Sequence, residues 1–324
     1  MSPRTPAVTR MTVVKPGWLT TVQDRGREGY RRYGVSVSGA MDRIAYTLGN
    51  RLVGNADGAA ALEITVSGPE IIFESQSVFA VTGGDLSPTL DGRPIVLWTG
   101  MRAPSGSRLS FGARRTGARC YLAVAGGIDV PPHLGSRSTH IATRTGGLQG
   151  RPLTKGVILH TGRCSQREAR EGLAIPVRLR PRYSPSPVLR VLPGPQHELF
   201  LPDVLVSLVS APYTLSSQSD RMGYRLVGPK LRHAAARWIS DGTVMGALQV
   251  PADEQPILLM ADCQTIGGYP KPAVVISADL HLAGQLAPGD SVHFVMTTLA
   301  EARRVLRAQW AALDEALPAP RSRR

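Results

Sequence analysis

A polar stretch rich in glycine reads Asp262-Cys263-Gln264-Thr265-Ile266-Gly267-Gly268-Tyr269-Pro270-Lys271. It separates the apolar runs 256–261 and 273–276, each of which has the length and composition of a buried β-strand. Glycine has no Cβ and adopts positive φ, so Gly267 and Gly268 allow backbone N–H groups to approach a ligand. A plain hairpin turn is the alternative for this pattern. We interpret the stretch as a site loop between two strands, with residues 219–226 as a companion loop.

Short apolar runs of this kind recur along the chain, which contains 34 glycines and 26 prolines. Turn signals such as Gly83-Gly84-Asp85 and Gly126-Gly127 separate them. One helix is predicted over residues 38–55, where Ile44, Leu48 and Leu52 recur every fourth residue, and an amphipathic helix is predicted over 299–317. This pattern predicts a mainly β fold, a barrel or sandwich with a few short helices and a C-terminal helix. In the first half the predicted strands are 61–66, 70–73, 78–82, 94–98, 108–111 and 120–125.

The length of 324 residues favours two domains. Residues 166–187 are rich in arginine and proline and read as a linker. We therefore predict a disordered extension at 1–11, a first domain at 12–165, a second domain at 188–298, and a C-terminal helix with a basic tail at 299–324. The tail ends in Arg321-Ser322-Arg323-Arg324 and is expected to be disordered.

A possible internal repeat relates the two halves. Residues 23–30 and 264–269 keep the order Gln, Gly, Gly, Tyr, with a difference of two residues in length. In this alignment Asp24 is the counterpart of the carboxylates in the second half. The comparison predicts a duplicated fold with a polar loop in each half.

The net charge of +14 raises the question of a nucleic-acid or membrane partner. The basic residues are spread along the chain, and no zinc-finger spacing, RNA-recognition signature or long basic helix accompanies them. No apolar run approaches the length of a membrane span, and the first residues lack an apolar core of signal-peptide length. We expect a cytoplasmic protein that binds neither nucleic acid nor membrane.

The cysteines are Cys120, Cys164 and Cys263, an odd number without metal-ligand spacing, which favours reduced thiols in the cytoplasm. Cys263 lies within the site loop, so a nucleophile is one interpretation. We favour a buried, inert thiol, because no histidine lies nearby in the sequence to activate it. The seven histidines form no zinc motif, and no metal site is expected.

Several long motifs carry a family resemblance. They are residues 17–42, the segment 120–139 with its core Tyr-Leu-Ala-Val-Ala-Gly-Gly-Ile-Asp-Val-Pro, Gly194-Pro195-Gln196, and the loops 219–226 and 262–271. Together they resemble the C subunit of the bacterial three-component 5-oxoprolinase, over about residues 12–297. The wider family includes the antagonist of a sporulation-kinase inhibitor and the carboxyltransferase domain of urea carboxylase, also known as the second subunit of allophanate hydrolase. Cys263 departs from the family loop, where a larger polar residue, often arginine, is expected.

The resemblance implies two tandem cyclophilin-like β-barrel domains, partner proteins that are the A and B subunits of 5-oxoprolinase, and ATP-driven opening of the 5-oxoproline lactam to glutamate. ATP, with Mg²⁺, is expected at a site on a partner or shared with one, because the chain lacks a Gly-x-x-x-x-Gly-Lys-[Ser/Thr] loop. Two alternatives remain. One is a carboxyltransferase partner of a biotin enzyme, with biotin on another polypeptide because this chain has no biotinylation motif. The other is a regulator that only binds a partner resembling the B subunit.

Such a substrate carries a free carboxylate, for which a guanidinium is a bidentate partner. We expect Arg221 or Arg137 as this anchor, with a structural ion pair as the alternative for each. Lysine is scarce here, and Lys271 is predicted to stabilise a developing phosphoryl or oxyanion charge, an exposed turn residue being the alternative.

Carboxylates and amides complete the predicted site. Asp262 and Asp220 are candidates for a general base or a Mg²⁺ ligand, although aspartates in loops often cap turns. Substrate-binding roles are predicted for Gln264, Thr265, the backbone amides of Gly267 and Gly268, and Asp24.

Overall fold

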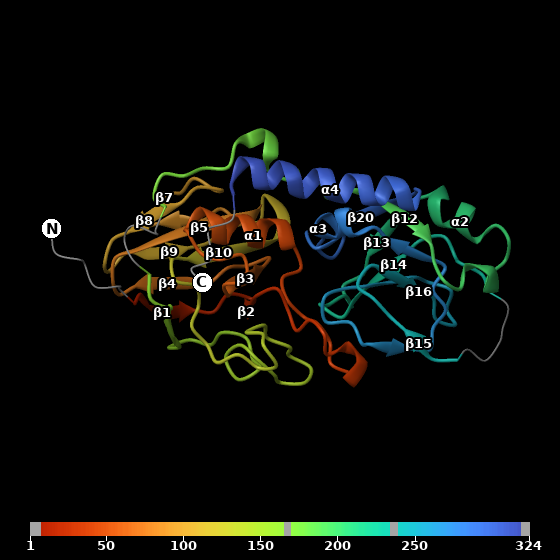
Figure 1. Cartoon of the computed structure of the whole chain (residues 1–324), viewed down its shortest axis with the longest axis horizontal. Helices are drawn as coiled ribbons and strands as arrows, with labels where there is room; N and C mark the ends of the chain where they lie inside the picture. The colour runs from red at the N-terminus through yellow and green to blue at the C-terminus, as the bar shows by residue number, and fades with distance from the viewer. Residues whose placement is uncertain (1–7, 165–169, 234–238, 319–324) are drawn as a thin grey trace. The chain divides into compact units, whose positions relative to one another are not determined.

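The computed structural model describes residues 8–164, 170–233 and 239–318, and the chain forms two compact units (Figure 1). Unit 1 contains the residues up to Arg27, Ser38–Arg182 and those from Ala311 onward. Unit 2 contains Glu28–Val37 and Tyr183–Trp310. The segment Glu28–Val37 joins unit 2 through Arg31, which donates to the Thr243 carbonyl, and through Ser36 Oγ, which donates to the Cys263 carbonyl at 2.8 Å. The prediction of a disordered extension over 1–11 is wrong for its last residues, because a strand begins at Arg10 and Met11 is fully buried. Residues 1–7 and the basic tail from residue 319 lie outside the described residues.

Unit 1 is built from two antiparallel sheets that enclose one core. In the six-stranded sheet the order is β11 (Ile158–His160), β1 (Arg10–Lys15), β4 (Glu70–Phe73), β9 (Arg108–Ser110), β6 (Thr89–Leu90) and β7 (Arg93–Pro94). In the five-stranded sheet it is β2 (Leu19–Gln23), β3 (Ala61–Thr65), β10 (Thr116–Val124), β5 (Ser77–Asp85) and β8 (Met101–Ala103).

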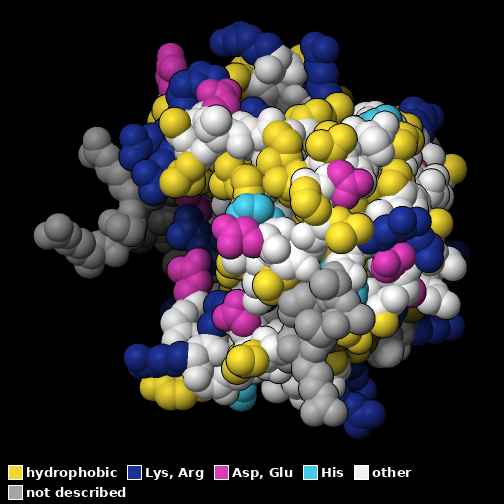
Figure 2. All heavy atoms as spheres, turned by 90° about the vertical axis from the view of Figure 1, so that its right-hand side faces the viewer, with side chains coloured by type: hydrophobic (Ala, Val, Ile, Leu, Met, Phe, Trp, Pro, Cys, Tyr) yellow, Lys and Arg dark blue, Asp and Glu magenta, His cyan; other side chains and the backbone are white. Residues whose placement is uncertain are grey.

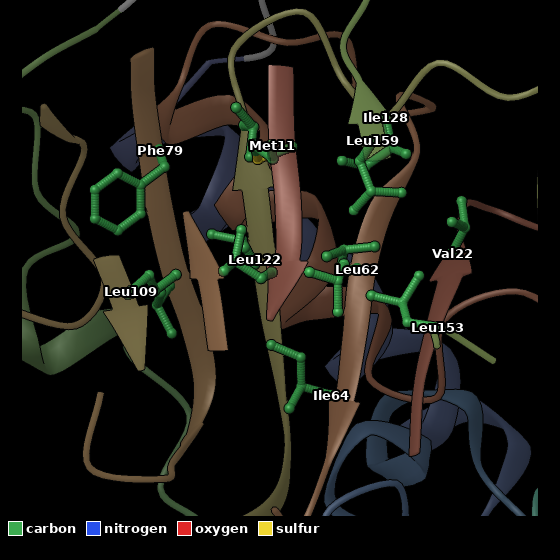
Figure 3. Packing of buried hydrophobic residues seen from close by; sticks show 14 of the residues in the cluster. Met11, Val22, Leu62, Ile64, Phe79, Leu109, Leu122, Ile128, Leu153 and Leu159 are labelled. Carbon is green, nitrogen blue, oxygen red and sulfur yellow. The ribbon is translucent and has the colours of Figure 1, made fainter. Parts of the chain in front are cut away.

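The core of unit 1 follows from alternation along these strands. In β1 every second residue is buried, which points Met11 and Val13 inward. They join side chains of the other sheet, such as Leu62 and Leu122, in a continuous apolar cluster (Figure 3). Burial of this kind stabilises the unit by about 1.5–3 kcal/mol for each large aliphatic side chain.

Helix α1 (Arg43–Leu52) packs on the five-stranded sheet. Asp42 caps its N-terminus by accepting a hydrogen bond from the Ala45 N–H at 2.9 Å. Close approach to β5 depends on Gly49, because a Cβ at this position would lie 2.8 Å from Thr82 Oγ1. Thr82 Oγ1 instead donates to the Ala45 carbonyl at 2.7 Å. The missing side chain therefore sets the distance between helix and sheet.

Unit 2 is organised around a closed seven-stranded barrel. Its order is β12 (Val188–Pro193), β19 (Ala273–Val275), β16 (Ala247–Gln249), β17 (Ile257–Leu259), β14 (Gly223–Val227), β13 (Tyr213–Leu215) and β20 (Ser291–Met296). A separate two-stranded ribbon pairs β15 (Asp241–Gly242) with β18 (Ile266–Gly267). Because β18 lies within the predicted site loop, the ribbon fixes the course of that loop.

Short helices complete the chain. Beyond α1 they are α2 (Val204–Ser210), α3 (Leu280–Ala283), α4 (Leu299–Ala316) and the 3-10 turns Arg31–Tyr33, Val177–Leu179, His197–Leu199 and Ser277–Asp279. The first part of α4 packs Ala302, Val305 and Leu306 against unit 2. In unit 1 the buried Arg51 binds the last turns of the same helix, donating to Asp314 at 2.7 Å and to the Leu317 carbonyl at 2.9 Å. In the described part of the chain, no helix is long and apolar enough to cross a membrane.

The structure confirms the mainly β fold with few helices and a C-terminal helix. Two local predictions are wrong. Gly83-Gly84-Asp85 is not a turn, because β5 continues through it beside a register shift in β10, a position where glycine is common. Residues 95–98 form no strand; Trp98 adopts φ 61°, which turns the chain, and Ile95 and Leu97 pack on the core instead.

The predicted repeat of 23–30 in 264–269 is also wrong. Gln23 ends strand β2, whereas Gln264 lies in the loop before β18. Strands β1 and β12, in contrast, share one pattern of buried and exposed positions. Each precedes a glycine packed against backbone, Gly17 against Ser67 and Gly194 against Lys271.

Charged side chains are mixed on the surface. On the face drawn in Figure 2, Lys and Arg side chains are interspersed with Asp and Glu and with apolar side chains. The positive net charge therefore does not gather into one stripe on that face.

Candidate functional site

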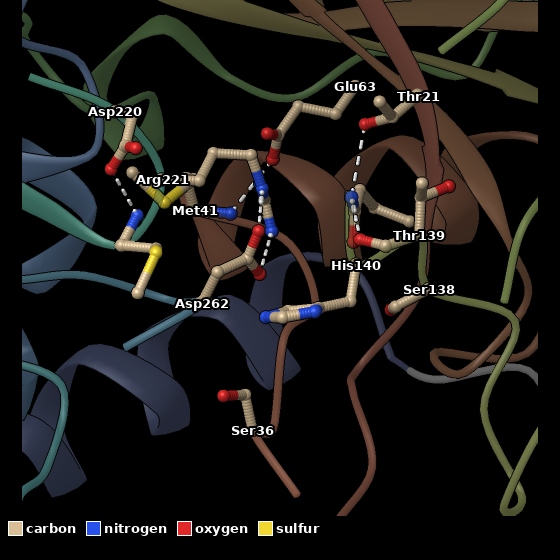
Figure 4. Close-up of polar contacts among 12 residues, drawn as sticks. Thr21, Ser36, Met41, Glu63, Ser138, Thr139, His140, Asp220, Arg221 and Asp262 are labelled. Carbon is tan, nitrogen blue, oxygen red and sulfur yellow. Dashed lines mark hydrogen bonds and ion pairs between the residues drawn. The ribbon is translucent and has the colours of Figure 1, made fainter. Parts of the chain in front are cut away.

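The companion loops of unit 2 meet in a buried ion pair. Asp262 follows β17, and its carboxylate accepts two hydrogen bonds from the Arg221 guanidinium, at 2.9 Å from Nε and 3.0 Å from Nη2 (Figure 4). The Asp262 N–H also donates to the Arg221 carbonyl at 2.8 Å. Both side chains are buried. The sequence left Arg221 either as a substrate anchor or as part of a structural ion pair. In the structure it forms the ion pair, and its partner is Asp262.

Asp220 caps the turn that leads into β14. Its Oδ1 accepts from the Met222 N–H at 2.7 Å and from the Gly223 N–H at 3.2 Å (Figure 4). Such a side chain closes an Asx turn. The structure does not bring Asp220 and Asp262 together as a metal site, and among the described residues no group of three His, Cys, Asp or Glu side chains could hold a metal ion.

Lys271 lies in a different environment. It is 1% exposed, yet among the described residues its Nζ has no hydrogen-bond partner, and its one ion pair is with Asp241 Oδ2, at 3.4 Å. Asp241 is 53% exposed, and its pKa is lowered, first by the Gly242 N–H and then by the charge of Lys271. Gln196 joins the two, because its Oε1 accepts from the Lys271 N–H at 3.0 Å and its Nε2 donates to Asp241 at 3.3 Å.

Two glutamines and a glycine border this lysine. Gln264 Nε2 donates to Gln249 Oε1 at 3.0 Å, and Gln249, 2% exposed, has no partner for its own Nε2 among the described residues. A Cβ at Gly267 would lie 2.5 Å from Gln249 Nε2, so a side chain there would have to displace this amide. Gly267 pairs with Asp241 in the ribbon, and the Val250 N–H donates to the Pro270 carbonyl, which places Gln249 beside Lys271.

We call this group the Lys271 cluster: Gln196, Asp241, Gln249, Gln264, Gly267 and Lys271. Of the other residues predicted for the loop, Thr265 contributes its carbonyl to the Thr243 N–H at 3.0 Å and Gly268 is exposed. Gln249 was not predicted from the sequence, although a glutamine inside the apolar run 246–251 was a signal of a buried polar group. The cluster presents a buried cation and an amide donor that the fold does not use.

Unit 1 holds a second polar group around Asp24. Its Oδ1 accepts from the Gly26 N–H at 2.8 Å and from the hydroxyls of Ser136 and Ser138, and its Oδ2 accepts from the Arg137 N–H. The carboxylate therefore fixes the loop that follows β2 to the loop 136–138. The Arg137 side chain is held as well, because its Nε donates to the Val130 carbonyl at 2.8 Å.

Gln23 and His140 lie beside Asp24 in the same unit. Gln23 Nε2 donates to Thr21 Oγ1 at 3.0 Å and to the Thr139 carbonyl at 3.1 Å, and the three labelled residues Thr21, Thr139 and His140 are drawn in Figure 4. The Thr143 N–H donates to His140 Nδ1 at 3.2 Å, which assigns the ring proton of a neutral imidazole to Nε2. His140 was not predicted from the sequence, whereas Gln23 opens the polar stretch 23–30 that the sequence analysis singled out.

Cys263 is a buried thiol. Burial raises its pKa, and the nearby Arg31 opposes this effect. A protonated thiol is a poor nucleophile. The structure thus agrees with the interpretation of an inert cysteine.

The sequence model of the family described as carboxyltransferase domain, subdomain A and B, matches residues 33–296. The chain belongs to this carboxyltransferase family. It is 42% identical to the C subunit of 5-oxoprolinase from Escherichia coli, over 92% of this chain and 95% of that protein. It is 37% identical to the C subunit of 5-oxoprolinase from Haemophilus influenzae, over 91% and 94%. These matches confirm the resemblance drawn from the motifs.

Urea enzymes are also similar to this chain. Urea amidolyase of Saccharomyces cerevisiae is 36% identical over 93% of this chain, which spans 17% of that protein. The crystal structure of Kluyveromyces lactis urea carboxylase matches with a TM-score of 0.89 and 33% identity, over 99% of this chain and 30% of that one. The family fold therefore covers nearly the whole of this chain and a minor part of those enzymes.

Proposed function

We propose that this chain is the C subunit of an ATP-dependent 5-oxoprolinase, which opens the lactam of 5-oxoproline to L-glutamate together with the A and B subunits. One observation carries the proposal: the similarity to the C subunit of Escherichia coli 5-oxoprolinase extends over 95% of that protein. The urea enzymes contain a comparable region within much longer chains. The free thiols Cys120, Cys164 and Cys263 support a reducing compartment such as the cytoplasm.

The Lys271 cluster supports chemistry on a polar, anionic substrate. A lactam is a resonance-stabilised amide, so its carbonyl carbon becomes electrophilic when its oxygen is phosphorylated. ATP with Mg²⁺ would supply that phosphoryl group. The buried ammonium of Lys271 fits one anionic oxygen, and the amide of Gln249 fits a second acceptor. The cluster lacks further cations for a whole triphosphate, so we place the nucleotide on a partner or at a site shared with one.

Carboxyl transfer is the second candidate, and the similarity to Kluyveromyces lactis urea carboxylase favours it. In that case biotin would arrive on another polypeptide. The same donors, Lys271 and Gln249, would then face a carboxylated ligand. The two candidates differ in their substrates and are separated by a direct assay.

The test is co-expression of this chain with the A and B subunits, followed by an assay of ATP-dependent glutamate release from 5-oxoproline. We expect turnover by the complete complex and none when this chain is omitted. Lys230→Met is a matched control, because Lys230 is exposed and pairs with Glu254 at the surface. Turnover of urea with bicarbonate and a biotin carboxylase, and none of 5-oxoproline, would reject the proposal in favour of carboxyl transfer.

A further inference from the structure

We propose that Lys271 binds the carboxylate of the substrate and that Asp241 holds this place as an internal counter-ion until the substrate displaces it. The inference rests on the proposed function for the identity of the substrate. Its physical basis is independent: a buried ammonium with unused donors, covered by a half-exposed carboxylate.

The first step concerns the cost of burying Lys271. An ammonium removed from water is unfavourable unless short hydrogen bonds replace its hydration. Charge-assisted N–H···O contacts are typically about 2.7–2.9 Å long, whereas Nζ lies 3.4 Å from Asp241. The same unit contains a well-satisfied pair, Arg221 with Asp262, at 2.9 and 3.0 Å. Lys271 therefore keeps its donors for a group other than Asp241.

The second step compares Lys271 with the arginines that the sequence suggested as anchors. The Arg221 guanidinium is buried and bidentate to Asp262. The Arg137 side chain donates to the Val130 carbonyl and lies 3.9 Å from Asp129. Binding a substrate carboxylate at Arg221 would first break its two hydrogen bonds to Asp262, whereas Arg137 is more exposed than Lys271 and already faces the carboxylate of Asp129. Displacing Asp241 from Lys271 breaks two long contacts, the 3.4 Å ion pair and the 3.3 Å hydrogen bond from Gln196 Nε2, and returns a half-exposed carboxylate to water.

The third step identifies what else the ligand contains. Gln249 Nε2 is a buried donor without a partner in the described structure, and the glycine at position 267 lets the backbone approach it closely. A ligand with a carboxylate for Lys271 and a carbonyl oxygen for Gln249 satisfies both groups. The chemical class is a small carboxylate with a neighbouring amide carbonyl, which 5-oxoproline represents.

The experiment is isothermal titration calorimetry on the assembled complex with ligands that separate the two features. The ligands are 5-oxoproline, pyrrolidinone (the lactam without its carboxylate), cyclopentanecarboxylate (the carboxylate without the lactam) and inorganic phosphate. The variants are Lys271→Met, Asp241→Asn and the control Lys230→Met. Thermal unfolding of each complex verifies that it is folded.

We expect Lys271→Met to weaken binding of 5-oxoproline and cyclopentanecarboxylate about tenfold or more and to leave pyrrolidinone unchanged. Asp241→Asn should tighten both carboxylates by removing the competing anion, and Lys230→Met should change nothing. Equal binding of the carboxylates by wild type and Lys271→Met would overturn the inference. Unchanged affinity in Asp241→Asn would overturn the role of the counter-ion. Tight binding of phosphate without the carboxylates would overturn the assignment to a carboxylate.

Different results would reject the proposed function and the proposed carboxylate site at Lys271. If the complex binds cyclopentanecarboxylate through Lys271 but releases no glutamate from 5-oxoproline, the site stands and the proposed function falls. If Lys271→Met turns over 5-oxoproline with unchanged kcat and KM, the function stands and the site falls.

Discussion

Two of the ion pairs in unit 2 differ in how well each partner satisfies the other. Arg221 and Asp262 are both buried and share two hydrogen bonds of 2.9 and 3.0 Å. Lys271 is equally buried, but it has one contact of 3.4 Å to a carboxylate that remains half exposed. The difference separates a pair that holds the fold together from a charge kept for a ligand.

Asp24 in unit 1 resembles the Arg221–Asp262 pair, because hydrogen bonds within the fold satisfy it. Its two oxygens accept four hydrogen bonds from Gly26, Ser136, Arg137 and Ser138. Three of these donors point at Oδ1 and one at Oδ2, so most of the accepting capacity of this carboxylate is used within the loops. We therefore interpret Asp24 as the residue that organises its loops, and the predictions below test this division from the largest effect to the smallest.

Breaking the satisfied pair should have the largest effect on stability. Arg221→Met leaves Asp262 buried without its cation, and we expect the free energy of unfolding to fall by about 3–5 kcal/mol. Denaturant unfolding measures the change. The double variant Arg221→Met, Asp262→Leu is the control and should recover a large part of the loss. A loss below about 1 kcal/mol in Arg221→Met would contradict a structural role for the pair.

Removing the charge of Lys271 should affect stability little and turnover strongly. Lys271→Met replaces an ammonium that makes no hydrogen bond in the described structure, so we expect the free energy of unfolding to change by less than about 1 kcal/mol. Turnover by the complex should fall about 100-fold, because the carboxylate anchor is lost. Unfolding experiments and the glutamate assay are run in parallel. A large loss of stability with normal turnover of the folded fraction would make Lys271 structural.

Asp24→Asn tests the satisfied carboxylate of unit 1. The new amide NH₂ faces donors, so at least one of the four hydrogen bonds is lost, and we expect a destabilisation of about 1–3 kcal/mol. Thermal unfolding gives the change. Asp129→Asn is the control, because Asp129 is exposed and lies 3.9 Å from Arg137. If Asp24→Asn and Asp129→Asn are equally stable, the interpretation of Asp24 as a structural residue is wrong.

The smallest effect concerns pH and Asp241. Its pKa is lowered in the folded state, first by the Gly242 N–H and then by Lys271. A lowered pKa means that the ionised group stabilises the fold above the ordinary aspartate pKa of about 3.9, and that this stabilisation is lost as pH falls through the folded-state value. The difference in melting temperature between wild type and Asp241→Asn should therefore be present at neutral pH and vanish in acid. A difference in melting temperature that grows as the pH falls would contradict a lowered pKa of Asp241.

Local sequence patterns predicted the strands and helix α1 well, because alternation and fourfold spacing record which face of an element is buried. These patterns failed where contacts with distant parts of the chain determine the local backbone structure. Trp98 turns the chain although it ends an apolar run, and Gly83 lies inside a strand although it looks like a turn. Neither outcome is encoded within a few residues.

The site was predicted in part. The loop containing Gln264, Gly267 and Lys271 does form a cluster, and the glycine at 267 allows the loop to approach Gln249 Nε2 closely. The sequence also predicted that loop 219–226 accompanies this loop, and Arg221 does bind Asp262. The pairing of Lys271 with Asp241, which lies on the facing strand of the ribbon, could not be predicted. Gln249 was missed because a single glutamine in an apolar strand has no motif around it. Pairing across the fold, which decides which charges are satisfied, is a property of the tertiary structure.

The most direct test of the central claim is a crystal structure of this chain with bound 5-oxoproline. We predict the carboxylate at about 2.8 Å from Lys271 Nζ, with Asp241 rotated towards solvent and the Arg221 to Asp262 pair unchanged. A ligand carboxylate bound to Arg221, with the contact between Lys271 and Asp241 intact, would contradict the account.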